Sequence, residues 1–262
     1  MINPVQKQIL IVALFAGELM LKSGAEVYRV EDTISRICKA CGIHYAEAFV
    51  TTTGIFISID MKGDNKNDMH TFIKRIHGGT TDLDKISRLN QFSRQMASSG
   101  MSANEAMEEL KEIGKRGPYP LLLRLFAAGL VAGFFCLIFG GKPIDFPAAF
   151  LTGTAAYYVG ELLEKIAVNY FIRSFCCSAF SALVTQLICH ASVGNTGGAI
   201  IIGCLMIFVP GVAITNAIRD LLTGDVLAGI SRLTEASVIA IALAAGAGIV
   251  LKLFAVIGGG SL

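Results

Sequence analysis

Polar and charged side chains lie between two strongly apolar segments, in residues 209–236. This stretch reads VPGVAITNAIRDLLTGDVLAGISRLTEA. An ionisable side chain near the centre of a bilayer costs on the order of 2.5–3.5 kcal/mol, so those that persist there usually face water, a partner charge or a solute. We therefore interpret this stretch as the part of the chain in which binding chemistry is concentrated.

The stretch begins with an expected interruption of a helix. Pro210 has no N–H to donate to the preceding turn, and Gly211 loosens the helix further. Interrupted helices recur at transporter binding sites, where freed carbonyls and half-helix ends coordinate ions or solutes. The alternative is a proline kink that serves packing, followed by an ordinary amphipathic loop. On the functional interpretation, the candidate solute or coupling residues are Asn216, Arg219, Asp220 and Asp225.

Further residues extend this candidate site. Gly224 and Gly229 would let neighbouring helices approach closely. Arg232 and Glu235 are three positions apart, so they share a helical face and could pair, which would lower the cost of burying either. Glu161, at the end of an earlier apolar segment, would carry protons if burial raised its pKa. Alternatively, it marks a solvated helix end.

Other chemistry-bearing patterns are weaker. Cys38 and Cys41 have the spacing of half a zinc site or a redox pair, but no second pair follows. We expect no metal and no cofactor. The chain has seven cysteines, most of them in apolar runs, so a disulfide framework is not expected. The spacing of residues in the sequence does not by itself bring together a nucleophile, a base and a group that orients the base, so we do not expect an enzyme.

The composition is that of a membrane protein. Of 262 residues, 53% are hydrophobic and only 16% are charged, and the mean hydropathy is +0.62. A soluble domain has roughly 45–50% apolar and 25% charged residues. Residues 1–116 hold 15 of the 22 Lys+Arg and 14 of the 20 Asp+Glu. The net charge of +2 gives no nucleic-acid footprint. We expect a polar domain over 1–116 and a transmembrane domain over 117–262.

Apolar periodicity predicts an α+β domain in the first part. A period of three to four predicts helices over 5–23 and 27–41, with Gly24 between them. A period of two predicts strands over 45–50, 55–61 and 70–76. Capping boxes at Thr81/Asp84 and Ser102/Glu105 predict two more helices. The expected order is therefore α-α-β-β-β-α-α. We expect the first helix to be retained, because no clear cleavage pattern follows it.

The second part predicts an α-helical membrane domain of about five transmembrane helices. The candidate spans lie near 121–139, 145–163, 172–192, 198–218 and 234–257, each close to the ~20 residues that cross a bilayer core. Most flanking lysines and arginines would then lie on the side of the amino-terminal domain. We therefore expect that domain to be cytoplasmic and the chain to contact the lipid bilayer as a multi-pass protein.

Two stretches resemble the signatures of the bacterial threonine/serine exporter family. The first is AGELMLKSGAEVYRVEDTISRICKACG with TTTGIFISI, and the second is VPGVAITNAIRDLLTGDVLAGISRLTEA. The resemblance spans nearly the whole chain. The matching positions, in family order and approximate spacing, are Ser23, Gly24, Ala25, Arg29, Val30, Glu31, Pro210, Gly211, Asn216, Arg219, Asp220, Gly224, Asp225, Gly229 and Arg232.

The resemblance implies secondary export of small metabolites across the bacterial inner membrane. The solutes are threonine and serine in the named members, and dicarboxylates such as succinate in a related two-component branch. Fused members carry a second membrane half, whereas this chain stops at Leu262. The chain thus resembles the larger subunit of a split exporter, which implies a separate small membrane subunit as partner.

Three functions remain open from the sequence. The first is a transporter subunit, in which Arg219 or Arg232 receives the carboxylate of an amino acid or a dicarboxylate equally well. The second is a membrane-anchored enzyme or sensor with its activity in residues 1–116, although five spans are excessive for an anchor. The third is an assembly scaffold, with the solute path in a partner and small-residue faces at Gly129, Gly133 and Gly246.

Overall fold

A computed structural model describes residues 4–43, 45–60, 69–191 and 196–257 of the chain. The chain divides into two compact units. The first comprises Met1–Gly117 and Val212–Leu233, and the second comprises Pro118–Gly211 and Thr234–Leu262. The sequence predicted two consecutive domains and therefore placed Val212–Leu233 in the second, whereas this segment lies in the first unit. This segment belongs there because its polar side chains bind the connection between the first two helices.

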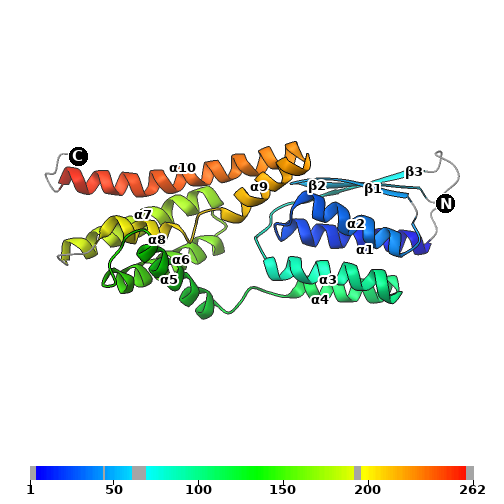
Figure 1. Cartoon of the computed structure of the whole chain (residues 1–262), viewed down its shortest axis with the longest axis horizontal. Coiled ribbons are helices and arrows are strands. Elements are labelled where there is room, and N and C mark those ends of the chain that lie inside the picture. Colours follow the sequence, from blue (N-terminus) through cyan, green and yellow to red (C-terminus); the bar gives the residue numbers. More distant parts are fainter. Residues whose placement is uncertain (1–3, 44, 61–68, 192–195, 258–262) are drawn as a thin grey trace. The chain divides into compact units, whose positions relative to one another are not determined.

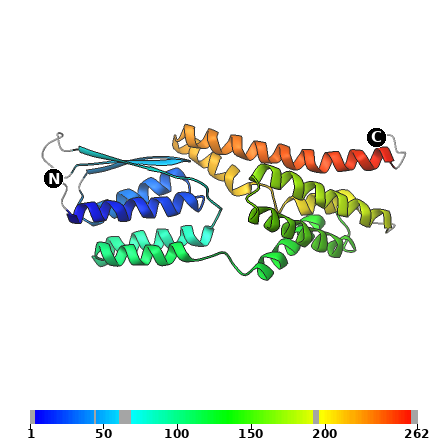
Figure 2. The same ribbon diagram turned by 180° about the vertical axis from the view of Figure 1, so that it is seen from behind.

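The first unit has the predicted order of elements. In chain order these are α1 (Pro4–Lys22), α2 (Val27–Ala40), β1 (Tyr45–Thr51), β2 (Gly54–Asp60), β3 (Met69–Arg75), α3 (Leu83–Ser99) and α4 (Ala103–Lys115). The strands form an antiparallel sheet in the order β1-β2-β3. Figures 1 and 2 show the sheet on one side of α1 and α2, with α3 and α4 on the other.

The core of this unit lies between the sheet and the helices. Ile55, Ile57 and Ile59 alternate along β2 and are buried, as two-residue periodicity requires of a half-covered sheet. In α2, every third or fourth residue is apolar and buried, including Val30 and Ile34. Among the described residues, the side chains on the outer face of the sheet are exposed or half-buried. The alternation of the sequence thus decides which face of each element is covered.

Of the two helix N-caps predicted from the sequence, one is confirmed and one is shifted by a residue. Ser102 accepts from the Glu105 amide while the Glu105 carboxylate accepts from the Ser102 amide, which confirms the predicted capping box of α4. The box predicted at Thr81 is wrong by one residue. Asp82 caps α3 instead, accepting from the Lys85 amide at 2.9 Å. A carboxylate at this position also interacts favourably with the helix dipole.

The first unit also holds α9 (Gly211–Thr223) and the first turns of α10 (Val226–Ile257). The predicted single span over 198–218 is therefore wrong. The helix ends at Leu205 and resumes at Gly211, because Pro210 lacks the N–H that a continuous helix needs. α10 begins eight residues earlier than the predicted fifth span, directly after a tight turn in which Gly224 has φ +95°.

The second unit is helical. It contains α5 (Leu121–Ile138), α6 (Asp145–Lys165), α7 (Tyr170–Ala191), α8 (Gly197–Leu205) and the rest of α10. Small residues lie where these helices meet; a Cβ on Gly133, for example, would stand 2.6 Å from the Phe146 ring. Within the described residues, α5, α7 and α10 are long and apolar enough to cross a membrane. The chain is thus mostly helical, with three such helices where about five were expected.

Candidate functional site

The connection between α1 and α2 is the point on which the two signature stretches converge. α1 ends at Lys22, and Gly24 takes a left-handed backbone conformation with φ +81°, which glycine adopts without strain. The Ser23 hydroxyl donates to the Leu19 carbonyl at 2.7 Å. This sharp turn leaves the carbonyls of Gly24 and Ala25 and the first amide of α2 in need of partners.

Side chains from α9 and α10 supply those partners. The Asn216 amide donates to the Gly24 carbonyl at 2.8 Å. Asp220 accepts from the Val27 amide at 3.1 Å through Oδ1. Arg232 donates to the Ala25 carbonyl at 2.6 Å. Each contact joins positions about two hundred residues apart in the sequence.

Asp220 is the central charge of this arrangement. It is fully buried and stands at the first amide of α2, where a carboxylate interacts favourably with the helix dipole. Arg232 Nε lies 3.2 Å from Asp220 Oδ2, an ion pair that is not aligned as a hydrogen bond. Since the Arg232 side chain is only 11% exposed, each charge depends on the other for compensation.

A second carboxylate, Glu26, is held between two arginines. Its side chain is buried, its Oε2 lies 3.1 Å from Arg29, and its Oε1 accepts from Arg219. Burial raises the pKa of Glu26, but hydrogen bonds from its own backbone amide, Arg29 and Arg219 outweigh this and hold the pKa below its ordinary value. The Arg219 side chain remains 49% exposed, so most of its donors are accessible.

Glu31 joins α2 to the sheet. Its Oε1 accepts from the Val50 amide of β1 at 2.9 Å. Burial raises the pKa of Glu31; the Val50 hydrogen bond opposes this, while the negative charges of Asp225 and Asp220 add to it. The pKa of the buried Asp220 is also raised, chiefly by burial, so both carboxyl groups take up a proton more readily than an exposed one.

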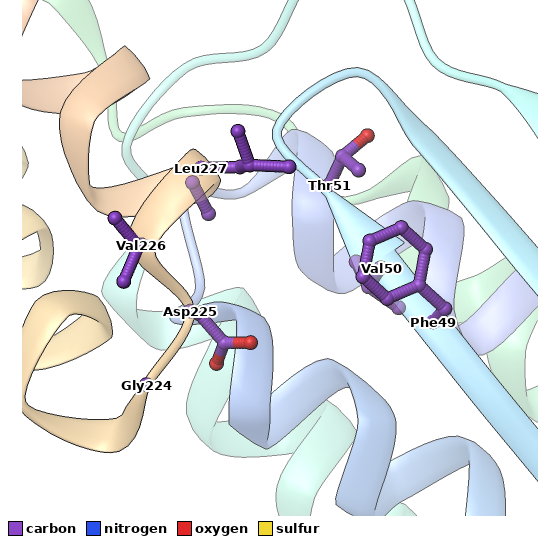
Figure 3. A pocket seen from close by; sticks show the side chains of 8 residues that line it. Phe49, Val50, Thr51, Gly224, Asp225, Val226 and Leu227 are labelled. Carbon is purple, nitrogen blue, oxygen red and sulfur yellow. The ribbon is translucent and has the colours of Figure 1, made fainter.

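Asp225 lines a small hollow at the end of β1. The hollow, of about 150 Å³, is bounded by Phe49–Thr51 and by residues 224–228. Figure 3 shows the Asp225 carboxylate beside the turn at Gly224, and Leu227 and Thr51 on the same hollow. Its volume is below the ~300–1,000 Å³ of usual ligand pockets. With acidic groups near it, it suits a cation or a proton better than a carboxylate.

The other predicted site residues lie elsewhere. Pro210 and Gly211 stand at the break between α8 and α9. Glu235 is exposed on α10, and Arg232 pairs with Asp220 rather than with Glu235. Glu161, on α6, accepts from Arg124 at 2.6 Å, and Arg124 also donates to the Tyr157 hydroxyl at 3.2 Å.

Sequence reasoning missed Glu26 and Arg124. Glu26 lies inside the first signature, between Ala25 and Arg29, so its position in the motif was a usable signal. Arg124 was detectable only as an isolated cation in an apolar helix. Their partners are distant in sequence, and spacing carries no information on such pairs.

Four of the seven cysteines, Cys38, Cys136, Cys177 and Cys204, are buried. All seven are free thiols. Burial, together with the neighbouring Cys41, raises the pKa of Cys38 to about 12, so this thiol stays protonated. Among the described residues, no group of three His, Cys, Asp or Glu side chains is placed to hold a metal ion.

These features define an α-helical membrane protein in which a carboxyl-terminal helical hairpin is bound to the polar amino-terminal unit by hydrogen bonds and by the Glu26–Arg219 ion pair. Residues 11–254 match the family described as "Putative threonine/serine exporter" (ThrE). The chain belongs to this family. No solved structure matches it.

Relatives of two lengths are similar to this chain. A protein of Mycobacterium tuberculosis (strain H37Rv) named "Probable threonine/serine exporter" is 23% identical over 88% of this chain and 43% of its own length. An Escherichia coli (strain K12) protein named "Probable succinate transporter subunit YjjP" is 22% identical over 92% of this chain and 93% of its own length. The chain therefore spans less than half of the first relative.

Proposed function

We propose that the chain is a subunit of a membrane transporter that exports small metabolites by secondary active transport. The solute is threonine or serine, or a dicarboxylate such as succinate. The observation that carries this proposal is the match of residues 11–254 to the exporter family, which includes both signature stretches. The names of the relatives, a threonine/serine exporter and a succinate transporter subunit, support the solute classes.

We further propose about five membrane crossings and a cytoplasmic amino-terminal domain in the bacterial inner membrane. α5, α7 and α10 supply three crossings. α6 has 21 residues, enough for a span, although it carries acidic residues at both ends. α8 has nine residues, too few for a full helical crossing; together with the non-helical residues 206–210 that follow it, it fits an interrupted span that ends before α9. The excess of lysine and arginine beside the amino-terminal domain supports its cytoplasmic side.

Within the site, we assign solute recognition to Arg219 in preference to Arg232. A planar guanidinium binds a carboxylate through two parallel hydrogen bonds. Arg219 is half-exposed and spends few of its donors on Glu26. Arg232 is buried and already committed to Asp220 and the Ala25 carbonyl, so a solute would have to displace protein groups to reach it. Asn216 and Asp220 position the hairpin that carries Arg219.

Proton coupling fits the acidic groups near the hollow. Glu31 has a raised pKa, and Asp225 stands close enough to contribute to it. Proton uptake by Glu31 relieves its repulsion with the negative charge of Asp225. We propose that Glu31 and Asp225 couple export to the proton gradient, with Glu161 of α6 and Arg124 of α5 as a second charged pair.

We propose a separate small membrane subunit as partner. The support is the length of the match to the E. coli relative, which is named a subunit and is covered over 93% of its length. The match covers only 43% of the M. tuberculosis relative, so that protein contains a further region on its own chain.

The test is efflux of threonine, serine and succinate from preloaded cells expressing the chain with and without its smaller partner. Partner-dependent efflux of one solute is expected. Arg219→Gln should abolish it at unchanged protein level, whereas Arg94→Gln, which removes an exposed arginine of α3, should not. Normal export by Arg219→Gln would remove that residue from the site. No efflux in either state would favour the alternative, a membrane-anchored enzyme or sensor.

A further inference from the structure

The hairpin formed by residues 212–233 has its polar and apolar faces reversed relative to a water-soluble protein. Its polar side chains Asn216, Asp220 and Arg232 face the amino-terminal unit and are buried or nearly so. Its large apolar side chains are exposed instead. These define the hairpin apolar surface: Ile218, Leu222, Val226, Leu227, Ile230 and Leu233.

Water is an unfavourable neighbour for this surface. The relative exposures of Leu222 and Leu227 reach 83% and 74%. Single exposed apolar residues are ordinary, but a contiguous group on one small element marks an interaction site. The one arginine at its rim, Arg219, is half-exposed, and a long cationic side chain at an interface can keep its charged end in the polar layer.

The hairpin apolar surface is continuous with a candidate membrane span. α10 begins at Val226, and Val226–Val256 contain an 18-residue window of mean hydropathy 2.3. At 1.5 Å per residue, this helix is about 48 Å long. The hydrocarbon core is about 30 Å thick and the bilayer with headgroups about 40–45 Å. The first turns of α10 therefore fall at the level of the headgroups when the rest of the helix spans the core.

The hairpin is rigid enough to hold this surface in place. The turn between α9 and α10 requires Gly224 in a left-handed conformation. α10 packs closely on α9 at Gly229, where a Cβ would lie 2.6 Å from Leu221 Cγ and 2.9 Å from the Ala217 carbonyl. Phe49 of β1, itself more than half exposed, lines the same hollow as Val226 and Leu227 and extends the apolar surface (Figure 3).

We propose that the hairpin apolar surface lies in the boundary between lipid headgroups and acyl chains, so that α9 is an interfacial membrane helix rather than part of a crossing. The lipid bilayer is its occupant, since the surface continues directly into a span that the bilayer must cover. An amphipathic helix at this depth buries its apolar face by ~5–10 Å. The proposal rests on α10 as a membrane span and is independent of which solute is carried.

Tryptophan fluorescence tests this directly, because the chain contains no tryptophan. Leu222→Trp and Leu227→Trp variants of the full chain are reconstituted into phosphatidylcholine/phosphatidylglycerol vesicles, with and without bromine on the acyl chains. Both should emit at shorter wavelength than free tryptophan and lose intensity in brominated lipid. The matched control is Leu83→Trp, on α3 of the same unit, where the native side chain is 61% exposed. It should keep its intensity in brominated lipid and be quenched by acrylamide in water.

Three results would overturn the proposal. Short-wavelength emission without bromine quenching at positions 222 and 227 would show that protein, from this chain or another copy, covers the surface. Long-wavelength emission with acrylamide quenching would show that water does. Equal bromine quenching of all three variants would mean unspecific adsorption of the unit, which also contradicts a defined surface. If one variant fails to fold, Ile230→Trp replaces it, because Ile230 lies on the same face of the hairpin.

Discussion

Removing the Asp220 carboxylate should selectively loosen the start of α2. Asp220→Ala deletes the acceptor of the Val27 amide and leaves Arg232 buried without its counter-charge. Loss of a helix cap costs about 0.5–2 kcal/mol, and breaking a buried ion pair costs about 3–5 kcal/mol. Arg232 keeps its bond to the Ala25 carbonyl, so we expect a total near the lower limit, about 3 kcal/mol.

Hydrogen exchange of the full chain in detergent measures this locally, which avoids assigning one unfolding free energy to two units. A loss of 3 kcal/mol corresponds to roughly a hundredfold faster exchange, since each 1.4 kcal/mol is tenfold. The accelerated amides should be those of the first turns of α2. Asp84→Asn, at an exposed ion pair of α3, is the control and should change little.

A double variant separates the cost of the uncompensated charge from the cost of the lost helix cap. In Asp220→Ala with Arg232→Met, no uncompensated charge remains, so part of the lost protection should return. The reasoning is refuted if Asp220→Ala exchanges like the wild type at Val27. It is also refuted if the double variant is as unprotected as the two single losses added together, because then Asp220 and Arg232 do not depend on each other.

Three further predictions concern charge and packing. Glu31 has a pKa raised above 4.5 in the folded chain, so its ionisation destabilises the fold. This destabilisation is absent below pH 4.5 and appears as pH rises through the folded pKa. Glu31→Gln should therefore raise the unfolding midpoint at neutral pH only. Glu26 has a lowered pKa, so its stabilisation is present above pH 4.5 and is lost as pH falls through the folded pKa. Glu26→Gln should therefore lower the unfolding midpoint at neutral pH. Midpoints that move in the opposite directions in a pH series of the two variants would contradict both assignments. Gly246→Ala should lower the thermal midpoint, because its Cβ would collide with Ser178 and the backbone of α7, while Gly248→Ala, which meets open space, should not. Equal midpoints for the two alanine variants would refute the close approach.

Local chemistry determined the elements of the amino-terminal unit. The period-two pattern around Ile55, Ile57 and Ile59 and the capping box at Ser102 act between near neighbours, so the sequence alone was enough to predict strands, helices and their order. The prediction failed at 198–218, where hydrophobicity indicated one span. Hydrophobicity reports the burial of side chains, but the continuity of a helix depends on backbone hydrogen bonds, which Pro210 interrupts.

The sequence by itself determined that this is a membrane protein, the order of helices and strands in the amino-terminal unit, and which residues in 209–236 are chemically unusual. Only the tertiary structure decided what those residues touch. Asp220 meets Val27 and Asn216 meets Gly24 across more than 190 positions, and Arg232 pairs with Asp220 instead of its helical neighbour Glu235. A buried charge takes the partner that best restores its lost solvation, and that partner is set by how the chain folds back on itself rather than by any local spacing.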